Sequence, residues 1–149
     1  MATADVSKDR GADIEAVRAA WLALLGGLVA EVERWAGELG WSTRRIEKKL
    51  EDHELGTHRV PALLLQREAV RILLDPIARD VPGSDGVVDL YLMPAFDDVA
   101  TLSHTDGEWR LHYAFPGTPT VHDLREAQWL PLTKAILDDV LQRLIRDVG

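Results

Sequence analysis

Polar side chains recur at every second position of several segments that are rich in β-forming residues. Because successive side chains of a strand point to opposite faces of a sheet, this spacing gathers the polar groups on one face. Carboxylate, phenol, guanidinium and imidazole groups held together in this way could recognise a polar partner, or act on a small ligand as acids and bases. Five residues are our candidate binding residues: Arg71, Asp89, Tyr91, Arg110 and His112.

The composition of this face is mixed, and we call it the mixed face. Besides the five candidates it carries Leu73, Asp75, Val87, Met93, Thr101 and Ser103. An antiparallel sheet can leave one face in water, so solvation alone is one explanation of the mixture. The other explanation is a recognition surface, in which apolar contact residues stand among polar ones.

Familiar motifs for catalysis and cofactor binding do not occur in the sequence. The chain has no cysteine, which excludes disulfides, thiolate metal sites and a cysteine nucleophile. It has neither the Gly-x-Ser-x-Gly elbow of serine hydrolases nor a phosphate-binding glycine-rich loop. No two histidines have the i, i+4 spacing of a helical metal motif, and counting from the turn at Asp106 places His104 near Arg110 and on the face opposite His112. We predict no metal, no cofactor and no catalytic residue, and the sequence leaves open whether the chain is an enzyme.

The charge of the chain argues against a nucleic-acid partner. Its 149 residues, about the size of one domain, carry a formal net charge of −8. The densest basic cluster, Arg44, Arg45, Lys48 and Lys49, is interrupted by Glu47 and followed by further acids. Such a chain lacks the contiguous basic patch that phosphate contacts need.

The apolar segments are also too short for a membrane span. The longest one, Ala19–Ala30, contains two glycines, and it falls well short of the roughly 20 residues that a span requires. It begins behind several acidic residues, unlike a signal peptide. We therefore expect no membrane contact and a cytoplasmic location.

Two amphipathic helices are expected at the ends of the chain. Apolar residues recur every three or four positions from Asp13 to Leu39, and again from Ile136 to Val148. Gly40 is a plausible end for the first helix, and Trp41 beside it is the tryptophan that we expect to be partly exposed. Residues 1–11 lack such a period and are expected to form a disordered tail, so that residues 12–149 make a single domain.

The middle of the chain indicates strands. The segments 62–66, 70–74, 87–93, 99–104 and 108–115 are rich in β-forming residues, and Asp106-Gly107 between the last two is a strong hairpin signal. The segment 41–55 fits either a helix or an edge strand, with the strand slightly favoured, and 115–120 is a predicted loop. These elements predict an α+β fold with an antiparallel sheet of about four or five strands, and both helices packed on its apolar face.

The sequence supports two hypotheses for function. The first is a non-catalytic binding module, such as an immunity-type or regulatory protein, that binds another protein; whether the chain also self-associates is left open. The second is a small enzyme or small-ligand-binding protein with a polar site on the sheet face. A deep pocket lined by Asp89, Tyr91, Arg110 and His112 would favour the second, and a flat face would favour the first.

Overall fold

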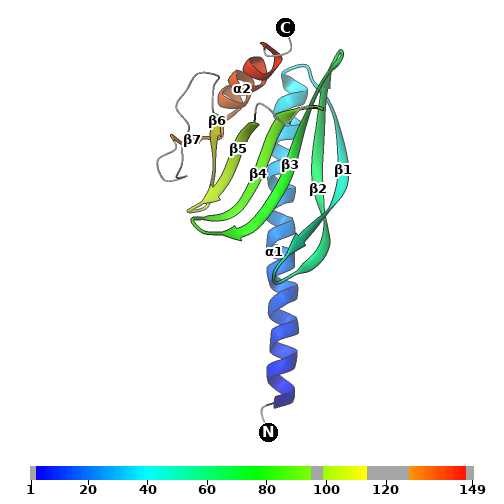
Figure 1. The fold of residues 1–149 in the computed structure, drawn as a ribbon, viewed down its shortest axis with the longest axis vertical. Coiled ribbons are helices and arrows are strands. Elements are labelled where there is room, and N and C mark those ends of the chain that lie inside the picture. The colour runs from blue at the N-terminus through cyan, green and yellow to red at the C-terminus, as the bar shows by residue number, and fades with distance from the viewer. Residues whose placement is uncertain (1–2, 95–98, 114–127, 147–149) are drawn as a thin grey trace.

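The described residues form two helices and one antiparallel sheet (Figure 1). The computed structural model describes residues 3–94, 99–113 and 128–146. The elements in chain order are α1 (Thr3–Glu38), β1 (Ser42–Asp52), β2 (Gly56–Arg67), β3 (Val70–Val81), β4 (Ser84–Leu92), β5 (Val99–Thr105), β6 (Glu108–Tyr113), β7 (Leu130–Pro131) and α2 (Lys134–Arg146). The α+β class and the antiparallel pairing are confirmed, but the prediction of about four or five strands is wrong, because the sheet has seven strands in the order of the chain.

Two strands, β1 and β7, extend the sheet beyond the five segments that the sequence indicated most clearly. The segment 41–55 contains β1, as the edge-strand interpretation favoured. The strand β7 consists of Leu130 and Pro131 alone, both exposed, and so carries no pattern that could have predicted it. The predicted loop 115–120 lies outside the described residues.

The strands β2 and β3 are longer than the segments that the sequence indicated, because each strand continues through a proline. Pro61 lies opposite Glu47 of β1, whereas β2 pairs with β3 only from Leu63 onward. Its missing N–H therefore removes no hydrogen bond of the β2–β3 ladder. Pro76 lies at a break in the β3–β4 register, where a β-bulge accommodates a residue without a donor.

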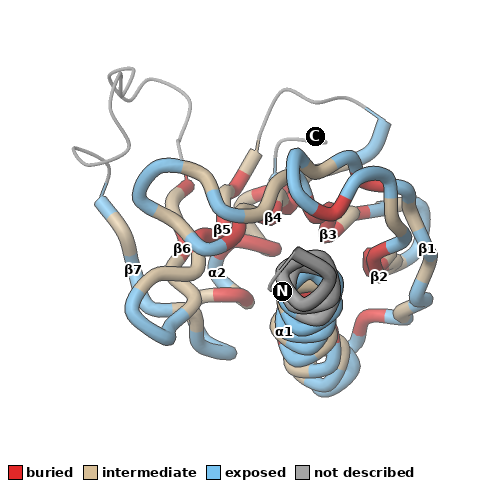
Figure 2. The backbone as a smooth tube through the Cα atoms, turned by 90° about the horizontal axis from the view of Figure 1, so that it is seen from below, coloured by how far each residue is buried: buried red, intermediate tan, exposed pale blue. Residues whose placement is uncertain are grey.

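The helix α1 lies against the sheet, which curves around it (Figures 1 and 2). Trp21 of α1 packs so closely on β4 that a Cβ atom added at Gly86 would lie 2.5 Å from its ring. Only glycine fits there without a shift of the indole. The helix begins at Thr3, well before the predicted Asp13, and the division into a tail and a domain stays a prediction.

One cluster of apolar side chains joins both helices to the sheet. On the strands it follows cross-strand pairs such as Leu102 with Leu111 and Ala100 with Tyr113. Helix α1 contributes residues such as Val29, and α2 contributes residues such as Leu141. The strand residues of these pairs lie on the apolar face of the sheet that the alternation predicted, and we call it the core face.

The end of α1 corrects one prediction. Gly40 has a φ of 92°, and Trp41 N donates to Ala36 O over 2.9 Å, so the glycine ends the helix as expected. Trp41 itself is only 4% exposed, not partly exposed as predicted. The Arg67 guanidinium covers it, with its carbon 4.5 Å from the ring centroid, in a cation–π contact.

Neither helix in the described part of the chain combines the length and the apolar character that a membrane crossing requires.

Candidate functional site

The register of the sheet brings the residues of the mixed face together in rows. The middle row crosses four strands and contains Asp75, Asp89, Thr101 and His112. The rows on either side contain Leu73, Tyr91 and Val99, and Val87, Ser103 and Arg110. Arg71 lies at one end of this surface, opposite Gln66 of β2. All five predicted site residues therefore share one face of the sheet, although they do not form one cluster.

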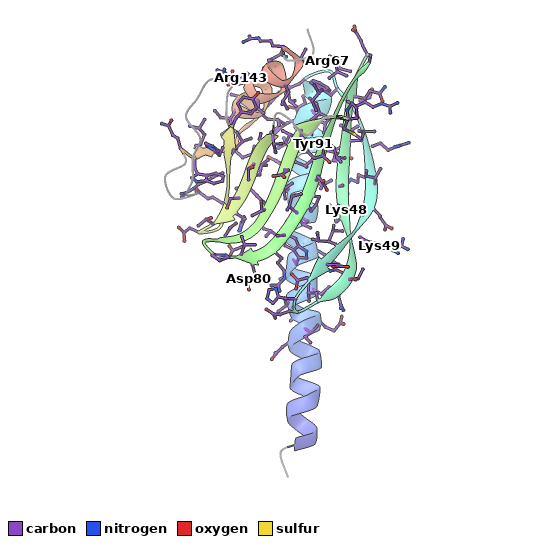
Figure 3. The ribbon with its side chains drawn as sticks, in the orientation of Figure 1. Lys48, Lys49, Arg67, Asp80, Tyr91 and Arg143 are labelled. Atoms are coloured by element: carbon purple, nitrogen blue, oxygen red, sulfur yellow. The ribbon has the colours of Figure 1, made fainter. Side chains whose placement is uncertain are left out.

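The centre of the mixed face is a hydrogen-bonded cluster in which Asp75 binds Lys48 and Tyr91, the two members of the cluster that Figure 3 labels. Lys48 Nζ donates to Asp75 Oδ1 over 2.5 Å and to Pro76 O over 2.8 Å. Tyr91 OH donates to Asp75 Oδ2 over 3.1 Å. Because β2 lies between β1 and β3, Lys48 reaches across a whole strand to make its contact. Both oxygens of a buried carboxylate are thus held by β1 and β4.

Asp89 stands directly beside Asp75 in the register, in a less favourable environment. Its Oδ1 accepts a hydrogen bond of 3.3 Å from Thr101 Oγ1. Burial and the charge of Asp75 raise the pKa of Asp89, against the opposing effects of the Thr101 hydrogen bond and of Lys48. Burial and the same Asp75 charge raise the pKa of Tyr91 to about 12, so Tyr91 stays a proton donor at neutral pH.

Arg110 and His112 lie on the same face as Asp75, but their contacts are at the β6–β7 end of the sheet. The Arg110 guanidinium lies 3.8 Å from a Glu108 carboxylate oxygen. His112 Nδ1 lies 3.1 Å from Gln128 O, and its ring centroid is 5.7 Å from that of Trp129. These contacts tie the two residues to β6 and to the segment before β7 rather than to the Asp75 cluster.

A hollow of about 180 Å³ lies at the end of the mixed face, across β1, β2 and β3. Its lining residues are Ser42, Thr43, Arg44, Leu64, Gln66 and Arg71. Of the predicted site residues only Arg71 belongs to it. Arg44 and Lys48 were missed because 41–55 was ambiguous, although the alternation of Arg44, Ile46 and Lys48 in the sequence could have placed them on one face.

A second, larger hollow of about 570 Å³ lies between α1 and the β6–β7 edge. Its apolar walls include Leu24, Trp35 and Trp109, and His104 also lines it. His104 pairs with Trp109, the residue next to Arg110, and it lies on the face opposite His112 as expected. The His104 ring lies 5.1 Å from the Trp109 ring, centroid to centroid, and His104 Nδ1 lies 3.0 Å from Asp85 Oδ2.

Three exposed side chains bring potential metal-ligand atoms close together. Atoms of His53, Glu54 and Asp80 lie within 4.8 Å of one another. Glu54 Oε1 is, however, 3.3 Å from a nitrogen of Arg79, whose positive charge opposes a bound cation. The group is explained as a set of surface ion pairs.

Comparison of the chain with protein-family models, with curated proteins and with solved structures finds no match.

Proposed function

We propose that the chain is a non-catalytic, cytoplasmic binding module, of an immunity or regulatory type, that recognises another protein through the mixed face. The observation that carries this proposal is the order already present on that face, where Lys48 and Tyr91 hold both oxygens of Asp75. A surface that is ordered before binding loses less side-chain entropy when a partner docks. The proposal takes both helices to lie on the core face, which leaves the mixed face open to a partner.

The shape of the surface favours a protein over a small ligand. Neither of the two hollows described above is lined by Asp89, Tyr91, Arg110 or His112. The face instead combines polar rows with an apolar side chain, Met93, that is 37% exposed. Polar groups interspersed with such residues are typical of protein interfaces.

A second candidate, a small enzyme or ligand-binding protein, is favoured by one observation. The raised pKa of Asp89, next to the carboxylate of Asp75, is what a general acid requires. A thermal-shift screen of small metabolites tests this candidate. A compound that stabilises the native protein, but not the Asp89→Asn variant, would support it over the binding module.

The test of the binding module compares two charge reversals of similar exposure. Arg110 lies on the mixed face with 41% of its side chain exposed, and Arg143 lies on α2 with 38% exposed. Native protein, Arg110→Glu and Arg143→Glu are each immobilised and exposed to an extract of the source cells. Captured proteins are identified by mass spectrometry, and the purified partner is then measured against all three by calorimetry.

We expect Arg110→Glu to weaken the partner's affinity by at least about tenfold, because a reversed charge meets the partner's complementary group. Arg143→Glu should bind like the native protein. A partner that all three proteins bind equally, or that only Arg143→Glu fails to bind, would show that the mixed face is merely solvated.

A further inference from the structure

We propose that the hollow at the end of β1, β2 and β3 is an oxyanion site. Resting on the proposed function, we infer further that it takes a carboxylate or phosphate group displayed by the protein partner. The hollow is lined by two arginines and by no acidic residue. We refer to it as the arginine hollow.

The strands place the two arginines on opposite sides of a shared floor. Ser42 pairs with Gln66, and Gln66 pairs with Arg71, so these three residues form one row across the strands. Arg44 pairs with Leu64 in the next row. Since β2 separates β1 from β3, the backbones that carry the two guanidinium groups stand about 10 Å apart. That spacing leaves room for one small anion between them, above Leu64 and Gln66.

The guanidinium groups of these two arginines differ from the others on the same three strands in having no partner among the described residues. Arg45 binds Glu33, Arg59 binds Glu47, and Arg79 binds Asp52. Arg67 donates to the carbonyl of Leu39 and covers Trp41. Arg44 and Arg71 are both exposed, and neither guanidinium group has a hydrogen bond or an ion pair with another described residue. Among the arginines of these three strands, the two whose guanidinium groups lack a described partner are thus the two that share a hollow.

The chemistry of the lining fits an oxyanion. Guanidinium groups bind carboxylate and phosphate through paired, charge-assisted hydrogen bonds. The Ser42 hydroxyl adds a further donor, and Gln66 Nε2 is already held by Glu68 O over 3.2 Å, which fixes the floor. An anion placed here would also relieve the repulsion between the two arginines.

The charge of the whole chain points to an anion on a partner rather than a free one. With a formal net charge of −8, the protein repels free anions at long range. A free anion must therefore rely on the local arginines alone and will bind weakly. A group on a partner is held in place by the remaining contacts with the mixed face, which raises its effective concentration at the hollow.

Nuclear magnetic resonance titration of the complete protein tests the site without any partner. Isotope-labelled protein is titrated separately with inorganic phosphate and with acetate, at an ionic strength held constant with sodium chloride. The probes are the Nε–H signals of Arg44 and Arg71 and the backbone amides of Ser42 and Gln66. We expect saturable shifts confined to these probes. The anion that binds more tightly identifies the partner's group as a phosphate or a carboxylate.

Arg44→Gln and Arg71→Gln should each weaken binding of the preferred anion by at least about tenfold, since each removes a charge-assisted hydrogen bond. Arg59→Gln is the matched control, because Arg59 is exposed on β2 but already paired with Glu47. Absence of saturation with both anions would overturn the site, as would equal losses in all three variants. If the site fails while Arg110→Glu still loses a partner, only this inference falls and the binding module stands.

Discussion

The arginines at the two ends of strands β1 to β3 differ in whether they are paired with an acidic residue. At the β1–β2 hairpin end, Arg79 is 11% exposed and donates to both oxygens of Asp52, over 3.0 and 3.1 Å. At the other end, Arg44 and Arg71 are exposed and have no partner among the described residues. The comparison indicates which cations hold the fold together and which remain available to a ligand.

At the β1–β2 hairpin end, the partners of Asp52 lower its pKa despite its burial. Burial alone would raise the pKa of Asp52, but hydrogen bonds from Arg79 and from the backbone amides of Leu55 and Glu54 keep it well below its usual range. A carboxyl whose pKa is lowered by folding stabilises the protein above its unfolded pKa. That stabilisation is lost as the pH falls towards the folded value.

The largest expected effect comes from breaking this buried pair. Arg79→Met leaves Asp52 without its cationic partner, and we expect a loss of about 3–5 kcal/mol in the free energy of unfolding at neutral pH. Urea denaturation followed by circular dichroism measures it. The double variant Asp52→Asn, Arg79→Met should recover part of the loss. A single variant as stable as the native protein would show that the pair contributes nothing.

A smaller effect is expected at the centre of the mixed face. Lys48→Met removes the ammonium group bound to Asp75, a charge-assisted hydrogen bond worth about 1.5–3 kcal/mol. The same denaturation experiment gives the value. Lys49→Met serves as the control, because Lys49 is an exposed neighbour on the opposite side of β1. Equal effects of the two substitutions would argue that Lys48 is also a surface charge without a structural role.

Replacing Asp89 should increase the free energy of unfolding, unlike the two substitutions above, and the increase should depend on pH. A carboxyl with a raised pKa in the folded protein contributes stability below its unfolded pKa, and that contribution is lost as the pH rises through the folded pKa. Asp89→Asn should therefore be more stable than the native protein at pH 7. The gain should vanish below about pH 4, where the native Asp89 is protonated in both states. Denaturation curves across this pH range test the sign, and a variant less stable at pH 7 would contradict it.

The sequence predicted the faces of the sheet because alternation is a local property. The pattern separated Leu111 and Tyr113 from Arg110 and His112, and the register confirms that separation. The two helices were predicted from their periodicity for the same reason. Strand number was underestimated where local pattern was absent, as in β7.

The polar contacts could not be predicted in the same way, because they depend on which strands become neighbours. Lys48 and Asp75, like Arg44 and Arg71, are far apart in the chain and meet only through the register of β1, β2 and β3. The structure also separates the basic cluster of the sequence. Arg45 turns to Glu33 of α1, whereas Lys48 turns to β3. A run of cations in sequence thus became two unrelated ion pairs.

The smallest expected effect is at the unpaired end, where it sharpens the comparison with Arg79. Arg44→Gln and Arg71→Gln remove exposed charges that contact no described partner, so the free energy of unfolding should change by no more than about 0.5 kcal/mol.

If phosphate is the preferred anion, adding it should raise the free energy of unfolding of the native protein more than that of either variant. At about ten times its dissociation constant, a ligand that binds only the folded state adds about 1.4 kcal/mol to the native protein. The variants should gain much less in denaturation experiments at matched ionic strength. A loss of several kcal/mol in either variant without phosphate would mean that both ends of β1 to β3 use their arginines to hold the fold, and the contrast between them would disappear.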